Sequence, residues 1–289
     1  MFTQINYTVS DRIAEIELAR PEMMNAISPE METELHEALQ QADVDPDVKV
    51  IVLSAAGDNF SSGYDIGSLD PERPEKMGII DPVGETIEDY LTFWYRWDRQ
   101  SVDNLMKLWR LDKPVIAATQ GYVMGGGFWY QLAADLTVAA DDAVFGQPEV
   151  RHISNTTFLF AALAGWKNAN RYALTGDHFD APEAYRMGVV NEVVPRAELA
   201  QATREIALRI AKVPVASLRL NKAITMAGLQ ASGVGSGMLL NGVLSGFAHS
   251  SHGPERQDLL EAQREGGLRE FLRQRDGKFR PEPFGPKSS

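Results

Sequence analysis

The chain has 289 residues, of which 44% are hydrophobic and 24% are charged. These fractions are typical of a globular protein and argue against a disordered or fibrous chain. The formal net charge of -12 argues against broad binding of nucleic acid, because contacts to the phosphate backbone need a basic face. Since the sequence contains no cysteine, disulfides, thiolate metal ligands and a cysteine nucleophile are excluded.

Two features of the sequence bear on the cellular location that we expect for the protein. The first residues, Met1 to Asn6, lack a basic stretch followed by an apolar run, and no later segment approaches the ~20 apolar residues of a membrane span. We therefore expect a cytoplasmic protein that works without a membrane or a nucleic acid. The length suits one large α/β unit with a C-terminal appendage, or two domains.

The first part of the chain predicts strands that alternate with a helix. Residues 13–18 read Ile-Ala-Glu-Ile-Glu-Leu, the period-2 pattern of a strand with one wet face. Ser28 and Pro29 have the N-cap and N1 chemistry of a helix start, and the apolar residues that follow keep helical spacing. Residues 48–53 and 114–119 are short apolar segments typical of buried strands.

The remainder of the chain predicts more helix than strand. Residues 67–111 begin with a Pro-rich stretch, where we expect a mobile loop, and continue as a helical segment rich in aromatic residues. Further strands are expected at residues 136–139, 143–145 and 188–195, and helices from the glycines at 125–127 to about 134, then near 158–163, 168–174, 198–213, 217–226 and 258–275. This order predicts an α/β core over residues 1–200, a helical region over 201–280 and a flexible tail over 281–289.

Two glycine-bearing turns each follow a predicted buried strand directly. The first spans residues 60–66, and the second spans residues 121–127. A strand that ends in glycines and opens a helix presents unpaired N–H groups, with the positive end of the helix dipole behind them. If the two turns face each other, one N–H from each could hold an enolate oxygen, and each donor is worth about 3–4 kcal/mol. Alternatively, the glycines only allow a helix to pack closely on a sheet.

The motifs stand in an order that resembles the crotonase superfamily, the enoyl-CoA hydratases and isomerases. The similar segments are residues 20–26 (Arg-Pro-Glu-Met-Met-Asn-Ala), 62–66 (Ser-Gly-Tyr-Asp-Ile), 113–127 with Asp135, 145–149, 174–177 and 188–195. The resemblance covers residues 10 to 195 and implies a spiral of β-β-α units with a C-terminal helical region. It also implies an acyl-CoA substrate, with coenzyme A present only as part of that substrate, no permanently bound cofactor and no metal.

The resemblance assigns catalytic roles residue by residue. It implies that the backbone N–H groups of Tyr64 and Gly126 form an oxyanion hole, and that Glu149 is the catalytic carboxylate. A carboxylate in an apolar cleft is a stronger base and can move a proton at the α or γ carbon of an acyl group. The residues expected to bind the substrate are Ser62, Asp65, Ile66, Gly125, Trp129, Asn155, Lys278 and Phe279.

One departure from the family pattern bears on the reaction. Hydratases of this family carry a second glutamate two residues after the glycine run, where this chain has Trp129, and an indole can neither accept nor deliver that proton. Isomerisation of a double bond needs only one carboxylate, so it remains compatible with the absence of the second glutamate. Carbon–carbon cleavage and the hydrolysis of a β-dicarbonyl compound also pass through an enolate and remain compatible with it too.

The segment after Glu149 differs as well, and it predicts further groups near the reacting centre. His152, Asn155 and Thr156 fall there, and a histidine with an ordinary pKa near 6.5 suits proton transfer; a structural role beside Arg151 is the alternative. The aromatic segment 67–111 suits the roof of a wide acyl pocket or a subunit contact. Its acids, which are Glu85, Glu88, Asp89 and Asp98, suit a solvated helix face, although one of them could replace the missing second carboxylate.

The positions that concern coenzyme A and assembly also differ. Met23, Met24 and Gly67 stand where many relatives offer lysine to the phosphates of coenzyme A. By contrast, Arg273, Arg275, Lys278 and Phe279 resemble the last-helix contacts of the family, which often reach a neighbouring subunit, so a homotrimer or a dimer of trimers is expected. Three hypotheses remain open: a lyase or isomerase of acyl-CoA with a single glutamate, a C–C hydrolase of a β-diketone, and a non-catalytic family member.

Overall fold

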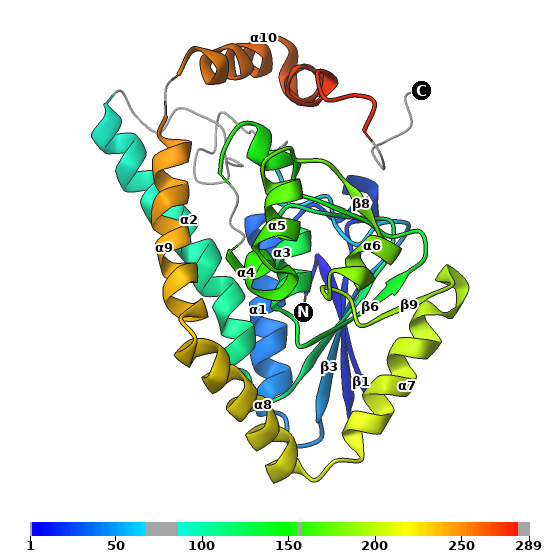
Figure 1. Cartoon of the computed structure of the whole chain (residues 1–289). Helices are drawn as coiled ribbons and strands as arrows, with labels where there is room; N and C mark the ends of the chain where they lie inside the picture. The colour runs from blue at the N-terminus through cyan, green and yellow to red at the C-terminus, as the bar shows by residue number, and fades with distance from the viewer. Residues whose placement is uncertain (1, 67–85, 155–157, 252, 283–289) are drawn as a thin grey trace.

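The structure, a computed structural model, describes residues 2–66, 86–154, 158–251 and 253–282 (Figure 1). The Pro-rich segment expected to form a mobile loop, and most of the expected flexible tail, lie outside the described residues. Strands and helices alternate through the first two thirds of the chain, and only helices follow among the described residues from residue 199 on. The α/β class with a C-terminal helical region is therefore confirmed.

A six-stranded sheet forms the centre of the fold, with the order β1-β2-β3-β4-β6-β9. β1 (Ile5–Ser10) and β2 (Ile13–Leu18) are antiparallel, whereas β2, β3 (Val50–Ala55), β4 (Val115–Thr119), β6 (Leu136–Ala140) and β9 (Glu192–Val194) follow one another in parallel. Parallel strands are covered on both faces, which is why β3 and β4 are almost continuously apolar. A second sheet contains β5 (Tyr122–Met124), β7 (Val144–Gly146) and β8 (Phe179–Asp180).

Helices cover both faces of the central sheet. One face packs against α1 (Pro29–Val44), α2 (Ile87–Arg110) and α3 (Gly126–Ala133), and the other against α7 (Leu199–Ala211). The other helices are α4 (Phe158–Ala164), α5 (Trp166–Ala173), α6 (Ala181–Arg186), α8 (Val215–Ala231), α9 (Val234–His249) and α10 (Pro254–Gly277), and the short 3-10 helices are η1 (Pro21–Met23), η3 (Pro148–Arg151) and η4 (Arg196–Glu198).

The starts of α1 and α2 are set by local chemistry. The Ser28 hydroxyl accepts a hydrogen bond from the Met31 N–H at 3.0 Å, and Pro29 occupies the first turn, as the sequence predicted. At the start of α2 the Thr86 hydroxyl and the Asp89 carboxylate form a reciprocal capping box. Such caps satisfy the first N–H groups of a helix, which have no partner inside it.

Helices α2 and α9 run side by side in opposite directions (Figure 1), and glycine makes their close approach possible. A Cβ atom on Gly246 would lie only 3.1 Å from the Tyr95 Cα, and one on Gly242 would lie 3.3 Å from the Arg99 Cα. Small residues at this spacing let two helix backbones come together. The end of α9 therefore packs closely against α2.

Helix α10 lies across one end of the molecule (Figure 1). It contacts η3. Gly267, with φ 68, breaks α10 into two parts. The ring of Phe271, fully buried, packs against His152 at 5.2 Å between centroids, and Arg151 pairs with Asp276 at 3.2 Å. The last helix thus covers the predicted site of its own chain.

One expected element needs correction, and some of the observed elements were not expected. The strand expected over residues 188–195 is limited to β9, because Gly188, with φ 78, and Val189 form a turn after α6. Strand β1 was not expected, because Ile5–Ser10 is mostly polar. Helix α9 lies within the helical region expected over residues 201–280, but it was not delimited as a separate helix, because its glycines at 235, 237, 242 and 246 lower the intrinsic helix propensity.

The described residues contain no single helix that is long and apolar enough to cross a membrane. The bent pair of α8 and α9 meets the length and composition criteria only when both helices are taken together.

The close contact of α2 with α9 can be tested by adding a side chain between them. Gly246→Val should lower the free energy of unfolding by about 1–3 kcal/mol, since the new methyl groups would meet the backbone of Tyr95. Gly228→Ala in α8 is the matched control, because its Cβ would meet nothing within 4 Å and alanine favours a helix by about 1 kcal/mol. Urea unfolding followed by circular dichroism measures the free energy of unfolding of both variants. Equal stability of Gly246→Val and wild type would contradict the close packing of α2 against α9.

Candidate active site

Glu149 lies where the two predicted glycine turns meet. It belongs to η3, which follows β7 directly, with Pro148 in its first turn. A Cβ atom on Gly125 would lie 3.4 Å from Glu149 Oε2, so the carboxylate sits directly over that glycine. Gly125 has φ 48, a left-handed conformation that favours glycine, and its N–H donates to the Gly146 carbonyl at 3.0 Å.

The two glycine turns lie side by side. An isolated bridge links Ser61 to Val123, and the Met124 N–H donates to the Ser61 carbonyl at 2.9 Å. A Cβ atom on Gly63 would lie 3.3 Å from the Gly126 nitrogen. Gly63 also has φ 96, so neither the space nor the backbone conformation at this position accepts a larger residue.

The backbone N–H groups of Tyr64 and Gly126 lie on the two facing turns. Within the described residues neither donates a hydrogen bond to a protein group, whereas the N–H groups of Gly63, Asp65 and Gly125 all do. Buried or crowded backbone N–H groups are nearly always paired. Two free donors on adjacent turns therefore form a place that can receive an oxygen atom.

The environment of Glu149 changes its acidity. Burial raises the pKa of its carboxyl group from 4.5 to about 7, although Arg275 and the Trp129 indole lower the pKa and Asp276 raises it further. Its Oε1 atom is buried and has no hydrogen-bond partner among the described residues. Near neutral pH, Glu149 is therefore present in both protonation states, as a group that shuttles a proton must be.

Trp129 forms a wall of the site. It lies in the first turn of α3, where its N–H donates to the Gly125 carbonyl at 3.0 Å. Its ring meets the Tyr64 ring edge-on, with 5.8 Å between the two ring centroids. The indole Nε1 is near enough to lower the pKa of Glu149, yet it makes no hydrogen bond of normal geometry among the described residues. Trp129 thus supplies an apolar surface and one N–H group beside Glu149.

His152 follows η3, and its N–H donates to the Glu149 carbonyl at 3.0 Å. Burial and the nearby cation Arg275 hold the pKa of its imidazole well below the usual value, with His249 and Arg256 acting in the same direction. Its Nδ1 atom is buried without a hydrogen-bond partner in the described part of the chain. His152 is therefore neutral, next to the backbone of Glu149.

The other predicted substrate-binding residues occupy different surroundings. The Asp65 carboxylate pairs with Arg20 at 3.1 Å and is almost fully buried, and Ile66 packs on the small apolar cluster under α10. The Ser62 N–H donates to the Met24 carbonyl at 2.9 Å. A contact of any of these side chains with substrate stays a prediction.

The two C-terminal candidates lie near Arg151. The Phe279 ring stacks on the Arg151 guanidinium at 4.3 Å, and the Lys278 Nζ lies 5.7 Å from the Phe279 ring. Asn155 and Thr156, in contrast, lie outside the described residues. The described structure thus brings Glu149, Gly125, Gly126, Tyr64 and Trp129 together, with His152 at their side.

The sequence analysis did not single out the group that holds the Tyr64 side chain. Glu32 of α1 accepts hydrogen bonds from the Tyr64 and Tyr130 hydroxyls, both at 2.7 Å. His36, one turn further along α1, lies 2.9 Å from the Tyr130 hydroxyl, and burial lowers its pKa to about 4, with help from Lys107. The spacing of Glu32 and His36 on one helix face was the only sequence signal for this network.

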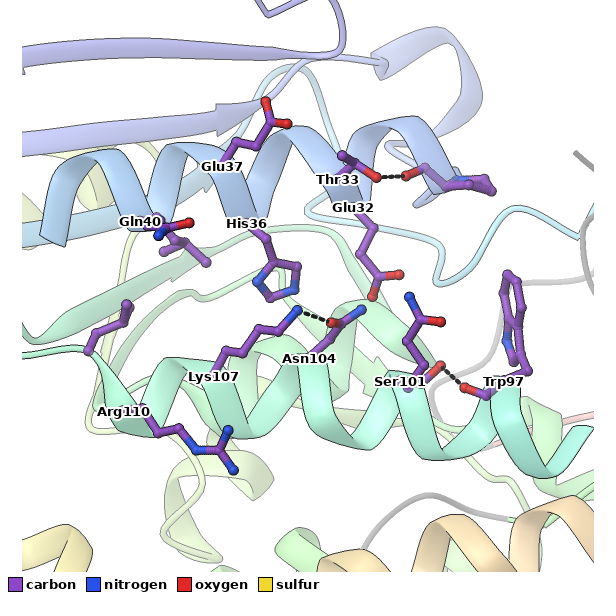
Figure 2. A pocket seen from close by; sticks show the side chains of 14 residues that line it. Glu32, Thr33, His36, Glu37, Gln40, Trp97, Ser101, Asn104, Lys107 and Arg110 are labelled. Carbon is purple, nitrogen blue, oxygen red and sulfur yellow. Dashed lines mark hydrogen bonds between the residues drawn. The ribbon is translucent and has the colours of Figure 1, made fainter. Parts of the chain in front are cut away.

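Glu32 also borders a groove of about 530 Å³ between α1 and α2. Figure 2 shows Glu32 and His36 on one side of this groove, facing Ser101 and Lys107 of α2. The tip of the Tyr64 ring therefore reaches a carboxylate that solvent in the groove can approach, while its other end lies against Gly126, where an added Cβ would be 2.8 Å from the ring. Tyr64 is held at both ends.

Known structures share this architecture. An enoyl-CoA hydratase/isomerase from Xanthobacter autotrophicus Py2 matches with a TM-score of 0.86 and 28% identity, over 96% of this chain and 99% of that chain. An enoyl-CoA hydratase from Mycobacterium smegmatis matches with a TM-score of 0.84 and 31% identity, over 98% of this chain and 96% of that chain. The fold is therefore that of the crotonase superfamily, as the sequence predicted.

The sequence comparisons agree. The profile of the family described as "Enoyl-CoA hydratase/isomerase" matches residues 8–252. The chain is 34% identical to (E)-benzylidenesuccinyl-CoA hydratase of Thauera aromatica, over 78% of this chain and 82% of that protein. It is 32% identical to hydroxycinnamoyl-CoA hydratase-lyase of Pseudomonas fluorescens, over 75% of this chain and 76% of that protein.

The chain belongs to the enoyl-CoA hydratase/isomerase family. Members of this family are enzymes that act on thioesters of coenzyme A. Among the described residues, no cluster of His, Asp or Glu side chains could hold a metal ion.

The raised pKa of Glu149 makes a prediction about stability. Because the ionised carboxylate is less favourable in the folded than in the unfolded chain, wild type should lose stability as the pH rises from 4.5 to about 7. Glu149→Gln carries no such charge, so its free energy of unfolding should exceed that of wild type by an amount that grows by about 2–3 kcal/mol between pH 5 and pH 9. Urea unfolding at several pH values measures this difference, and a pH-independent difference would contradict the assignment.

Proposed function

We propose that the protein acts on an acyl-CoA thioester through an enolate, as a lyase or isomerase rather than as an ordinary two-glutamate hydratase. In this proposal the N–H groups of Tyr64 and Gly126 hold the thioester oxygen, and Glu149 moves the proton. The observation that carries the proposal is that two unpaired backbone donors on adjacent turns lie beside a buried carboxylate whose pKa is about 7.

The chemistry follows from this arrangement. When the thioester oxygen accepts hydrogen bonds from the two N–H groups, the negative charge that develops on it is stabilised by about 3–4 kcal/mol per donor. The α-proton becomes more acidic, and the ionised form of Glu149 can accept it. The same carboxyl group can then return the proton to the α carbon or deliver it to the γ carbon, which moves a double bond.

The aromatic rings beside the glycine turns favour an aromatic or bulky acyl group. Tyr64 and Trp129 present their rings beside the glycine turns, and flat rings of a substrate pack well against such surfaces. Two relatives, the benzylidenesuccinyl-CoA hydratase and the hydroxycinnamoyl-CoA hydratase-lyase, carry names of aromatic acyl groups. These names support, for this chain, an acyl-CoA with an aromatic ring.

A second candidate is a C–C hydrolase of a β-diketone that needs no coenzyme A. Met23 and Met24, which are 44% and 42% exposed, stand where many relatives offer lysine, and this favours it. Turnover of cyclic diketones without coenzyme A would support this candidate, whereas strict dependence on a thioester would dismiss it.

Three further expectations from the sequence stay predictions. They are the cytoplasmic location, the domain boundaries and the alternative of a non-catalytic family member.

Exchange of the α-proton tests the role of Glu149. With 3-phenylpropionyl-CoA or butyryl-CoA in heavy water, wild type should incorporate deuterium at the α carbon, and Glu149→Gln should do so about 10²–10⁴-fold more slowly. Mass spectrometry measures the incorporation. Glu205→Gln, on an exposed position of α7, is the control and should exchange like wild type. Equal exchange by Glu149→Gln would remove Glu149 from the mechanism.

We also propose that the protein assembles as a homotrimer or a dimer of trimers through its C-terminal helices. The apolar side chains that support this assembly lie on α8 and α9 and are between 45% and 69% exposed: Leu220, Ile224, Leu239, Leu240, Leu244 and Phe247. An exposed apolar patch of this kind commonly marks a subunit interface.

Light scattering coupled to size-exclusion chromatography tests the assembly. Wild type should elute with three or six chain masses, and Ile224→Glu together with Leu240→Glu should shift the mass toward one chain, because a charge in an apolar interface is costly. Leu174→Glu, at a position that is 79% exposed outside these helices, is the control and should leave the mass unchanged. A wild-type monomer would contradict the proposal.

A further inference from the structure

The peptide group that joins Gly63 to Tyr64 has a fixed orientation. Its carbonyl accepts a hydrogen bond from the Ile27 N–H at 2.8 Å, and the next N–H along the chain, that of Asp65, donates to the Ile27 carbonyl at 3.0 Å. In a planar trans peptide the C=O and the N–H point in opposite directions. The Tyr64 N–H therefore points away from the Ile27 segment.

The peptide group that joins Gly125 to Gly126 is held in a similar way. Its carbonyl accepts a hydrogen bond from the Trp129 N–H at 3.0 Å, which is the first bond of α3. The Gly126 N–H lies on the opposite side of this planar group. With both peptide planes held, the separation of the two N–H groups remains to be set, because one oxygen atom must lie about 3 Å from each donor.

The Tyr64 ring connects the two turns. An added Cβ at Gly126 would lie 2.8 Å from two carbon atoms of this ring, so the ring packs directly on the Gly126 backbone. The Trp129 ring meets it edge-on, with 5.8 Å between the two centroids. The residue that carries one proposed donor thus contacts, through its side chain, the residue that carries the other.

Glu32 of α1 holds the far end of the Tyr64 ring. Its Oε1 atom accepts hydrogen bonds from the Tyr64 and Tyr130 hydroxyls, both at 2.7 Å. Tyr130 is almost fully buried in α3, and its hydroxyl also lies 2.9 Å from His36 Nε2. Glu32 thus ties the Tyr64 hydroxyl to the helix that begins at Gly126.

These contacts form a closed loop. From the Tyr64 ring the loop passes to Gly126, along one turn of α3 to Tyr130, and through Glu32 back to the Tyr64 hydroxyl. While the loop is closed, the ring cannot tilt without the loss of a hydrogen bond. Without Glu32, the ring is free to tilt on Gly126, and the two turns can shift relative to each other.

We propose that Glu32 is a positioning residue of the active site, which holds the Tyr64 hydroxyl and thereby sets the separation of the two N–H groups that receive the thioester oxygen. This inference rests on the proposed enolate chemistry and deepens it. In this role Glu32 touches neither the substrate nor the reacting atoms. Its loss should therefore affect the developing negative charge more than the binding of the neutral thioester.

The kinetics of α-proton exchange in heavy water test this role. With 3-phenylpropionyl-CoA or butyryl-CoA, Glu32→Ala and Tyr64→Phe should each lower kcat for exchange about tenfold and change KM less than about threefold. The loss is smaller than the ~10²–10³-fold that follows removal of a whole oxyanion donor, because both N–H groups remain. Mass spectrometry over a range of substrate concentrations measures both constants.

Three further variants complete the series. The double variant Glu32→Ala with Tyr64→Phe should exchange about as slowly as either single variant, because both changes remove the same hydrogen bond. Glu32→Gln keeps an acceptor oxygen and should recover most of the kcat that Glu32→Ala loses. Glu37→Ala, which removes an exposed carboxyl group at the border of the same groove, is the control and should keep both constants.

The groove between α1 and α2 permits a rescue experiment. Glu32 borders this groove of about 530 Å³ (Figure 2), so a small carboxylate can reach the space that Glu32→Ala leaves. Sodium formate should raise the kcat of Glu32→Ala at least threefold, because it supplies an acceptor for the Tyr64 hydroxyl. It should not raise the kcat of Tyr64→Phe, which has no hydroxyl, and sodium chloride at equal ionic strength should raise neither.

The outcomes separate this inference from the proposed function. If wild type exchanges the α-proton and folded Glu32→Ala does so with the same kcat, the inference is overturned while the proposed function stands. It is also overturned if the two losses multiply in the double variant, or if formate leaves Glu32→Ala unchanged.

Circular dichroism shows whether each variant folds. If Glu32→Ala does not fold, Tyr64→Phe decides, because it removes only one hydroxyl group, and an unchanged kcat overturns the inference. If wild type exchanges no α-proton, the proposed function itself fails, and the inference fails with it.

Discussion

The close approach of two glycine turns is the constraint on which the rest of the site depends. Gly63 and Gly126 come so near each other that an added Cβ at Gly63 would lie 3.3 Å from the Gly126 nitrogen. This contact leaves the N–H groups of Tyr64 and Gly126 without protein partners in the described structure. It also leaves Glu149 over Gly125, where a side chain would meet the carboxylate. A larger residue at any of these glycines would close the site.

Around this centre lie aromatic side chains. The Trp129 ring meets the Tyr64 ring edge-on, and Tyr64 extends from Gly126 to Glu32. Burial raises the pKa of Glu149 to about 7, although the Trp129 indole acts in the opposite direction.

Local signals in the sequence allowed much of this structure to be predicted. Ser28 and Pro29 marked the start of α1, the glycines marked both turns, and the resemblance to the crotonase superfamily gave the fold. Long-range features could not be predicted, because no local pattern relates residues such as Asp98 and His249, which are 151 positions apart. Helix α9, which brings them together, is rich in glycine and gives a weak helical signal. The assignment of the site residues stays a prediction.

The central claim is that two backbone N–H groups polarise one carbonyl oxygen, and the vibration of that carbonyl reports on it directly. An acyl-CoA with a ¹³C-labelled thioester carbonyl, bound to Glu149→Gln so that no reaction occurs, can be measured by isotope-edited infrared spectroscopy. Two strong hydrogen bonds should shift the carbonyl stretch to a lower frequency than in water. A bound carbonyl that absorbs at the frequency found in water, or above it, would contradict the account.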